Sequence, residues 1–64
     1  MITPIKQSRV SHSLSRNEVA ARASMGARTL SRVEDGEMVV SPQVISRISL
    51  AIESLVREQL REAG

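Results

Sequence analysis

Apolar residues along this chain recur at three- and four-residue steps, and no stretch alternates apolar and polar residues as a half-buried strand would. Serine or glycine interrupts these steps around residues 12–13, 24–26 and 35–37. The pattern therefore predicts an all-α fold of four helical segments, without an internal repeat or a low-complexity segment.

The first predicted helix begins at Thr3-Pro4, because a capping hydroxyl followed by proline at the first helical position favours a helix start. We expect it to end around residues 12–13 and to bury Ile5 and Val10. Serines at positions 8, 11 and 13 make it a weak helix by pattern.

The second predicted helix begins with a capping box, in which Ser15 and Glu18 each satisfy the other's free backbone amide. Leu14 before the cap and Val19 within the helix form a hydrophobic staple. The helix runs to Ala23, where the apolar pattern breaks.

The third predicted helix extends from Ala27 to about Glu34 and buries Leu30 and Val33. Gly36 is suited to a left-handed cap that ends this helix. Residues 37–40 then form a short loop.

The last predicted helix begins at Ser41-Pro42 and covers residues 42–62, since residues 43–63 contain no glycine or proline. We expect one long helix or a barely broken pair. Its apolar stripe consists of Ile45, Ile48, Ile52 and Leu55. Four more apolar residues widen this stripe beyond what three short helices could cover: Val44, Leu50, Val56 and Leu60.

Only about three residues join the second and third helices, and so short a connection forces them to cross steeply, as in a helix-turn-helix. A small residue is needed where the two helices touch, and Ala20 is well placed for that contact. The space beneath is filled by Val19, Ala23, Met25, Leu30 and Val33. The sequence thus predicts a helix-turn-helix over residues 15–36.

The net charge is only +2, but its distribution is uneven. Residues 1–33 contain six basic residues and one acidic residue, whereas residues 34–64 contain three basic and six acidic residues. One basic face meeting a polyanion would explain this asymmetry, and chance solvation of helix surfaces is the alternative. Phe, Trp and Tyr are missing, which argues against a single-strand binder that stacks bases on aromatic side chains.

The face of the third helix opposite Leu30 and Val33 carries the candidate DNA contacts: Ala27, Arg28, Ser31 and Arg32. Arg28 and Arg32 stand one turn apart, so both guanidinium groups point the same way and match guanine edges or neighbouring phosphates. An arginine pair at this spacing is by itself more often a solvated surface. The tight turn and the small-residue crossing favour DNA. Free amides around Ser15 and Arg16 offer a positive helix end to a phosphate.

One continuous stretch, Leu14–Gly36, reads LSRNEVAARASMGARTLSRVEDG and resembles the helix-turn-helix of the phage repressor/Cro, or XRE, family of transcriptional regulators. The resemblance extends over residues 3–52. It implies a lambda-repressor-like bundle of four or five helices. It also implies base readout by Ala27, Arg28, Ser31 and Arg32, and phosphate contacts by Ser15, Arg16, Asn17 and Thr29. Arg9 and Glu34 match a structural ion pair of that family.

The chain departs from the family pattern in several places. Ser24 stands where the family usually has glycine, which strains the turn, and Arg16 replaces the usual glutamine, which makes a phosphate contact more salt-dependent. Residues 37–40 lack the frequent basic residue of that loop. No glycine turn divides residues 51–61, which is why one long final helix is expected.

No catalytic, metal or cofactor site emerges from the sequence. Cysteine is absent, no phosphate-binding glycine loop is present, and the single histidine, His12, has no orienting partner. No apolar run approaches membrane-spanning length and the first residues do not form a signal peptide. We expect a non-enzymatic, soluble, cytoplasmic protein of bacterial or phage origin, with no cofactor, no metal and no membrane association.

Two functions remain open for a single domain of residues 1–64. The first is a sequence-specific regulator of transcription, a repressor that binds an inverted-repeat operator in double-stranded DNA as a homodimer through Leu50, Val56 and Leu60. The second is an antitoxin-type interaction module, whose apolar and acid-rich last helix binds a partner protein. The two overlap, because many antitoxins repress their own promoters.

Overall fold

The computed structural model describes residues 3–63, and the side chains of residues 3–62. Over these residues the chain forms four helices and no strand: α1 (Pro4–Ser11), α2 (Arg16–Arg22), α3 (Ala27–Glu34) and α4 (Pro42–Ala63). The predicted all-α fold with a helix-turn-helix and a long last helix is confirmed. Of the two alternatives for that last helix, the continuous one is correct. Residues 1, 2 and 64 of the predicted domain lie outside the described part.

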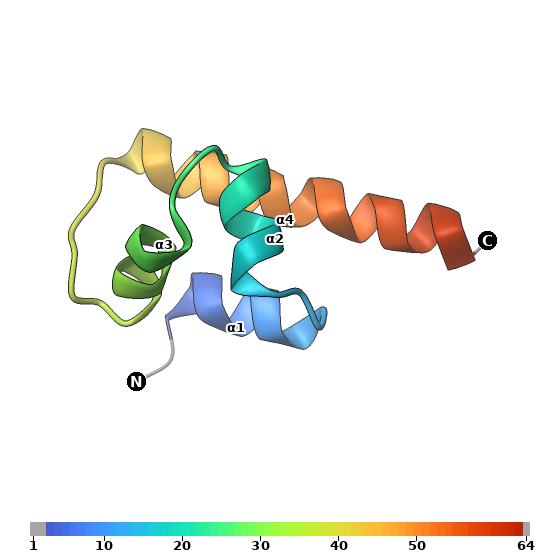
Figure 1. Cartoon of the computed structure of the whole chain (residues 1–64), viewed down its shortest axis with the longest axis horizontal. Coiled ribbons are helices and arrows are strands. Elements are labelled where there is room, and N and C mark those ends of the chain that lie inside the picture. Colours follow the sequence, from blue (N-terminus) through green and yellow to red (C-terminus); the bar gives the residue numbers. More distant parts are fainter. Residues whose placement is uncertain (1–2, 64) are drawn as a thin grey trace.

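Helix α4 runs along the longest dimension of the molecule, and the three short helices gather on its first part (Figure 1). Its 22 residues correspond to about 33 Å of helix, close to the longest extent of 37 Å. Both α1 and α2 pack against α4, and α2 also packs against α3. The start of α4 lies at the same end of the molecule as α3, while the end of α4 points away from the bundle (Figure 1).

The core lies between α4 and the helix-turn-helix. Its buried apolar residues are Leu14, Val19, Ala20, Ala23, Leu30, Val33, Ile48, Ala51, Ile52 and Leu55. The small side chains of Ala20, Ala23 and Ala51 allow α2 to approach its two neighbours closely, as predicted for Ala20. The sequence pattern missed Ala51. Of the predicted apolar stripe of α4, Ile48, Ile52 and Leu55 are buried, while Ile45 at its start is 37% exposed.

The predicted starts of α1 and α2 are confirmed by side-chain caps, whereas α3 begins at the predicted Ala27 without such a cap. The Thr3 hydroxyl accepts a hydrogen bond from the Lys6 amide at 3.3 Å. In α2 the Ser15 hydroxyl accepts from the Glu18 amide at 3.1 Å, and the Ser15 amide donates to the Glu18 carboxylate at 3.0 Å. Leu14, which precedes this capping box, is buried in the same core as Val19. Local signals therefore fix where α1 and α2 begin.

Helices α1, α2 and α3 all end in the same way, with a residue in the left-handed region that closes a Schellman motif. These residues are Ser13 (φ 57°), Ser24 (φ 59°) and Gly36 (φ 76°). After each of them, the next amide donates to a carbonyl five residues back, at 2.9–3.1 Å. The predictions of a left-handed Gly36 and of strain at Ser24 are confirmed, whereas the left-handed conformation of Ser13 was not predicted.

The buried side of α1 differs from the predicted one. Val10, an expected core residue, is 56% exposed, whereas its neighbour Arg9 is only 8% exposed. The prediction for Val10 is wrong because a buried carboxylate on α3 binds the arginine and fixes the rotation of this short helix. Ile5, the other expected contact, is partly buried against the core.

Candidate nucleic-acid interface

The outer face of α3 is set by the residues on its inner face. Leu30 and Val33 are buried in the core, so the residues between them along the helix turn outward. Arg28 and Arg32 are exposed one turn apart, and Ala27 and Ser31 beside them are half-buried. Three of the four predicted base contacts, Arg28, Ser31 and Arg32, therefore lie on one surface of α3, whereas Ala27 packs against the core at its edge. Thr29, a predicted phosphate contact, is half-buried near the start of the same helix.

Arg28 and Arg32 differ from the other basic residues of the three short helices. Lys6, Arg9, Arg16 and Arg22 each form an ion pair with a carboxylate. Neither Arg28 nor Arg32 forms an ion pair or a side-chain hydrogen bond with any residue between positions 3 and 62. Both forked guanidinium groups keep their donors for a ligand outside the chain.

At the start of α2 the capping box changes which groups a phosphate could use. The amide and hydroxyl of Ser15 are both engaged with Glu18, so the expected free amide of Ser15 is not available. The amides of Arg16 and Asn17 form no hydrogen bond within the described chain, and both side chains are exposed. The free backbone amides of this helix end are therefore those one and two residues beyond the cap.

A buried ion cluster joins the ends of the short helices. The carboxylate of Glu34 is fully buried, and it accepts hydrogen bonds from Arg9 Nε at 2.6 Å and from Arg9 Nη2 at 3.1 Å. Arg9 Nη1 also donates to the Leu14 carbonyl at 2.8 Å. Among the described residues, no buried side-chain nitrogen or oxygen lacks a hydrogen-bond partner. The predicted Arg9–Glu34 pair thus exists, and it ties α1 and the start of α2 to the end of α3.

Glu34 has a second partner that the sequence did not indicate. Arg16 Nε donates to Glu34 Oε1 at 3.3 Å, and the Arg16 side chain remains 43% exposed. Its two Nη groups have no hydrogen bond to any other described residue. Arg16 is therefore oriented from inside by Glu34 while its outer nitrogens face solvent beside the start of α2.

Two further contacts hold the end of α3 to the start of α1. The Thr3 hydroxyl donates to the Glu34 carbonyl at 2.9 Å, and Lys6 Nζ lies 3.6 Å from Asp35 Oδ1. On the opposite side, Arg22 of α2 donates to Ser54 and Glu58 of α4 at 2.6 and 2.7 Å. The helix-turn-helix is thus anchored on both sides, which gives the outer face of α3 a fixed orientation.

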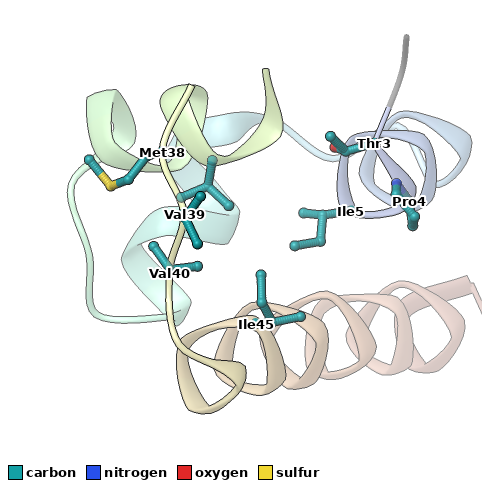
Figure 2. Close-up of a pocket in the computed structure, with 8 residues that line it drawn as sticks. Thr3, Pro4, Ile5, Met38, Val39, Val40 and Ile45 are labelled. Atoms are coloured by element: carbon teal, nitrogen blue, oxygen red, sulfur yellow. The ribbon is translucent and has the colours of Figure 1, made fainter. Parts of the chain in front are cut away.

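An apolar pocket of about 360 Å³ lies beside this site, between the start of α1, the loop before α4 and the first turns of α4 (Figure 2). Ile5 and Ile45 point toward each other across it, and Val40 lies beside them (Figure 2). The hydroxyl of Thr3 is engaged with Glu34, so this pocket offers a ligand mainly apolar surface. It lacks the convergent polar groups that catalysis requires.

The remaining predicted site residues lie on α4. Leu50 and Leu60 are 63% and 69% exposed, whereas Val56 is half-buried and packs against the core.

His12 is exposed, and its Nδ1 lies 2.8 Å from the Ser8 carbonyl of α1. No helix in the described part of the chain is long and apolar enough to cross a membrane.

Comparison with known proteins agrees with this geometry. A family model described as a helix-turn-helix domain matches residues 5–53, which is more than half of the chain. No curated protein and no solved structure matches it. The matched segment contains α1 except its first residue, all of α2 and α3, and the first part of α4. Domains of this kind bind DNA and are typically non-enzymatic. This chain belongs to the helix-turn-helix domain family.

Proposed function

We propose that this protein is a sequence-specific regulator of transcription of the phage repressor/Cro type, in which α3 enters the major groove of duplex DNA. The observation that carries the proposal is the pair Arg28 and Arg32. Both are exposed on the face of a firmly anchored helix, and neither is bound to another described side chain. A guanidinium group presents two parallel donors that match O6 and N7 of guanine.

Phosphate contacts would fix how α3 lies in the groove. The free amides of Arg16 and Asn17 and the outer nitrogens of Arg16 are positioned for one phosphate at the start of α2. Thr29 is a further candidate at the start of α3. Such contacts set register and orientation and carry no sequence information, so we assign discrimination to Ala27, Arg28, Ser31 and Arg32.

One α3 covers too little of the groove for strong specificity, so we further propose that the regulator binds an inverted-repeat operator as a homodimer and acts as a repressor. Leu50 and Leu60 remain on the proposed dimer surface because both are exposed. Val56 contributes mainly to the protein's own core. The regulator would act in the cytoplasm, encoded by a bacterial or phage gene.

Selection of bound sequences from random duplex DNA tests this proposal directly. We expect an enriched inverted repeat with guanine in each half-site. Binding to the selected operator should weaken and lose base preference in Arg28→Ala, while Arg47→Ala, which removes an exposed arginine of α4, should leave it unchanged. No enrichment, or equal effects of the two substitutions, would contradict the proposed function.

The exposed leucines of α4 also suit a second function, an antitoxin-type module that binds a partner protein. Copurification from the native host separates this function from the first. A foreign protein bound in equal amount through residues 44–60 would support it, and a homodimer free of other proteins would count against it.

A further inference from the structure

Helix α4 presents an exposed stripe along its side next to α1, where its charged residues border shallow hollows that Ser8 and His12 also line. It consists of four residues spaced by three, four and three positions, so that they follow one face of the helix. We call it the α4 stripe: Leu50, Glu53, Arg57 and Leu60. All four are exposed, and the buried residues Ile48, Ala51 and Leu55 lie on other faces of the same helix. No described element of the chain covers the two leucines.

The two charged residues of the α4 stripe are not neutralised by other described side chains. Glu53 and Arg57 form no ion pair or hydrogen bond between them, and none with any residue from 3 to 62. By contrast, Glu58, on the side that faces α2, pairs with Arg22 at 2.7 Å. The stripe therefore offers one carboxylate and one guanidinium group between two exposed leucines.

The order of these residues makes the α4 stripe complementary to itself. From the amino end it runs Leu, Glu, Arg, Leu, and from the carboxyl end it runs Leu, Arg, Glu, Leu. Two copies of α4 that pair in antiparallel orientation about position 55 bring Leu50 opposite Leu60 and Glu53 opposite Arg57, and the twofold axis repeats both contacts. A parallel pair would instead place Glu53 opposite Glu53 and Arg57 opposite Arg57.

We infer that the α4 stripe is the docking site for a second copy of this chain, in antiparallel orientation. This inference rests on the homodimer of the proposed function and names its surface and its geometry. Opposite charges at facing positions fix the register and exclude the parallel pairing. The paired segment of 11 residues is only about 16 Å long, so the interface is small and the dimer is weak in the absence of DNA.

The same pairing gives a useful spacing. Position 43, in the first turn of α4, lies 12 residues from position 55, or about 18 Å along the helix. The first turns of the two paired helices are then about 36 Å apart along the shared axis. Since α3 lies at that end of α4 (Figure 1), the pairing places the two α3 helices at opposite ends of the dimer, and the spacing of the first turns is close to one turn of DNA, roughly 34–36 Å.

Sedimentation equilibrium of the full chain without DNA tests the pairing. The wild type should dimerise. Glu53→Arg places arginine opposite Arg57 in both contacts and should weaken association at least about tenfold. The double variant Glu53→Arg/Arg57→Glu restores opposite charges and should recover wild-type association. Glu37→Arg makes the same charge change in the loop before α4 and should have no effect. Circular dichroism checks that all variants fold.

Three results would overturn the inference: a wild type that stays monomeric at millimolar concentration, a Glu53→Arg variant that dimerises like the wild type, or a double variant that fails to recover. DNA binding measured on a duplex with one half-site distinguishes failure of the proposed pairing from failure of the proposed function. Glu53→Arg should bind that duplex like the wild type and lose only cooperative binding to two half-sites. Absence of DNA binding in every variant would contradict the proposed function and leave the sedimentation result intact.

Discussion

The arginines at the two sides of α3 have opposite surroundings. On the inner side, Arg9 is buried, and each of its three guanidinium nitrogens donates a hydrogen bond, two to Glu34 and one to the Leu14 carbonyl. On the outer side, Arg28 and Arg32 are exposed, with no ion pair in the described chain. The residue type is the same, but only the outer pair keeps its donors for another molecule.

This difference shows how a very small domain separates stability from recognition. Glu34, the last residue of α3, binds the arginines that hold the helix in place, while Arg28 and Arg32 on the same helix remain unbound. Arg16 belongs partly to both groups, because Glu34 holds its Nε and its other nitrogens face solvent. The comparison predicts separate effects on unfolding and on DNA binding.

Glu34→Gln should have the largest effect. Without the carboxylate, the Arg9 guanidinium is left buried and uncompensated, and the free energy of unfolding should fall by about 3–5 kcal/mol. Urea denaturation followed by circular dichroism measures this loss. The matched control is Glu58→Gln, which breaks the exposed pair with Arg22 and should cost about 1 kcal/mol or less. Equal losses in the two variants would show that burial of the cluster is not what stabilises α3.

Arg28→Ala should instead weaken DNA binding and leave the free energy of unfolding nearly unchanged. On the selected operator it should cost about 1–3 kcal/mol of binding free energy and relax the preference at one base pair. Titration of matched operators that differ at single positions measures both effects. A uniform loss on all sequences would instead assign Arg28 to a phosphate.

Arg16→Ala should weaken DNA binding without changing base preference. It removes one charged phosphate contact, so affinity for all sequences should fall alike, and the salt dependence of log K should become less steep by about 0.9. Unfolding should change little because Arg9 still neutralises Glu34. Binding isotherms at several salt concentrations test this, and an unchanged slope would mean that Arg16 acts only within the ion cluster.

Ser24→Gly should have the smallest effect on stability. It should alter neither the buried ion cluster around Arg9 nor the exposed pair Arg28 and Arg32. Ser24 adopts a left-handed conformation that glycine reaches more easily, so stability should rise by about 0.5–1 kcal/mol. Gly36→Ala is the converse control, since a Cβ there meets no atom within 4 Å and only backbone strain is added. Base preference should stay the same in both variants, and a change would mean that the turns themselves orient α3.

The sequence predicted those parts of the fold that depend on local chemistry. Thr3-Pro4, the Ser15–Glu18 box and Gly36 mark helix ends because their hydrogen bonds span only a few residues. The left-handed Ser13 was missed because serine carries no strong signal for that conformation. Its role becomes visible only when the chain must turn sharply between α1 and α2.

The errors concern contacts between residues far apart in the sequence. Hydrophobicity placed Val10 inside, but the Arg9–Glu34 pair, which the family resemblance implied, spans 25 positions and turns Val10 outward. Likewise Ala51 is buried and Ile45 is partly exposed, because the packing of the other helices decides which part of α4 is covered. In the candidate site, the sequence indicated the outer face of α3 but not the link between Arg16 and Glu34.

The free end of α4 has a consequence for hydrogen exchange. The last contacts of this helix with the bundle are Glu58 with Arg22 and Gln59 with the His12 carbonyl, and residues 60–62 are exposed beyond them. Backbone amides there are protected only by the helix's own hydrogen bonds, so they should exchange with solvent far faster than those near Ile48. Any molecule that covers this end would slow their exchange, so the last turn of α4 can report assembly residue by residue in a chain that has no aromatic fluorophore.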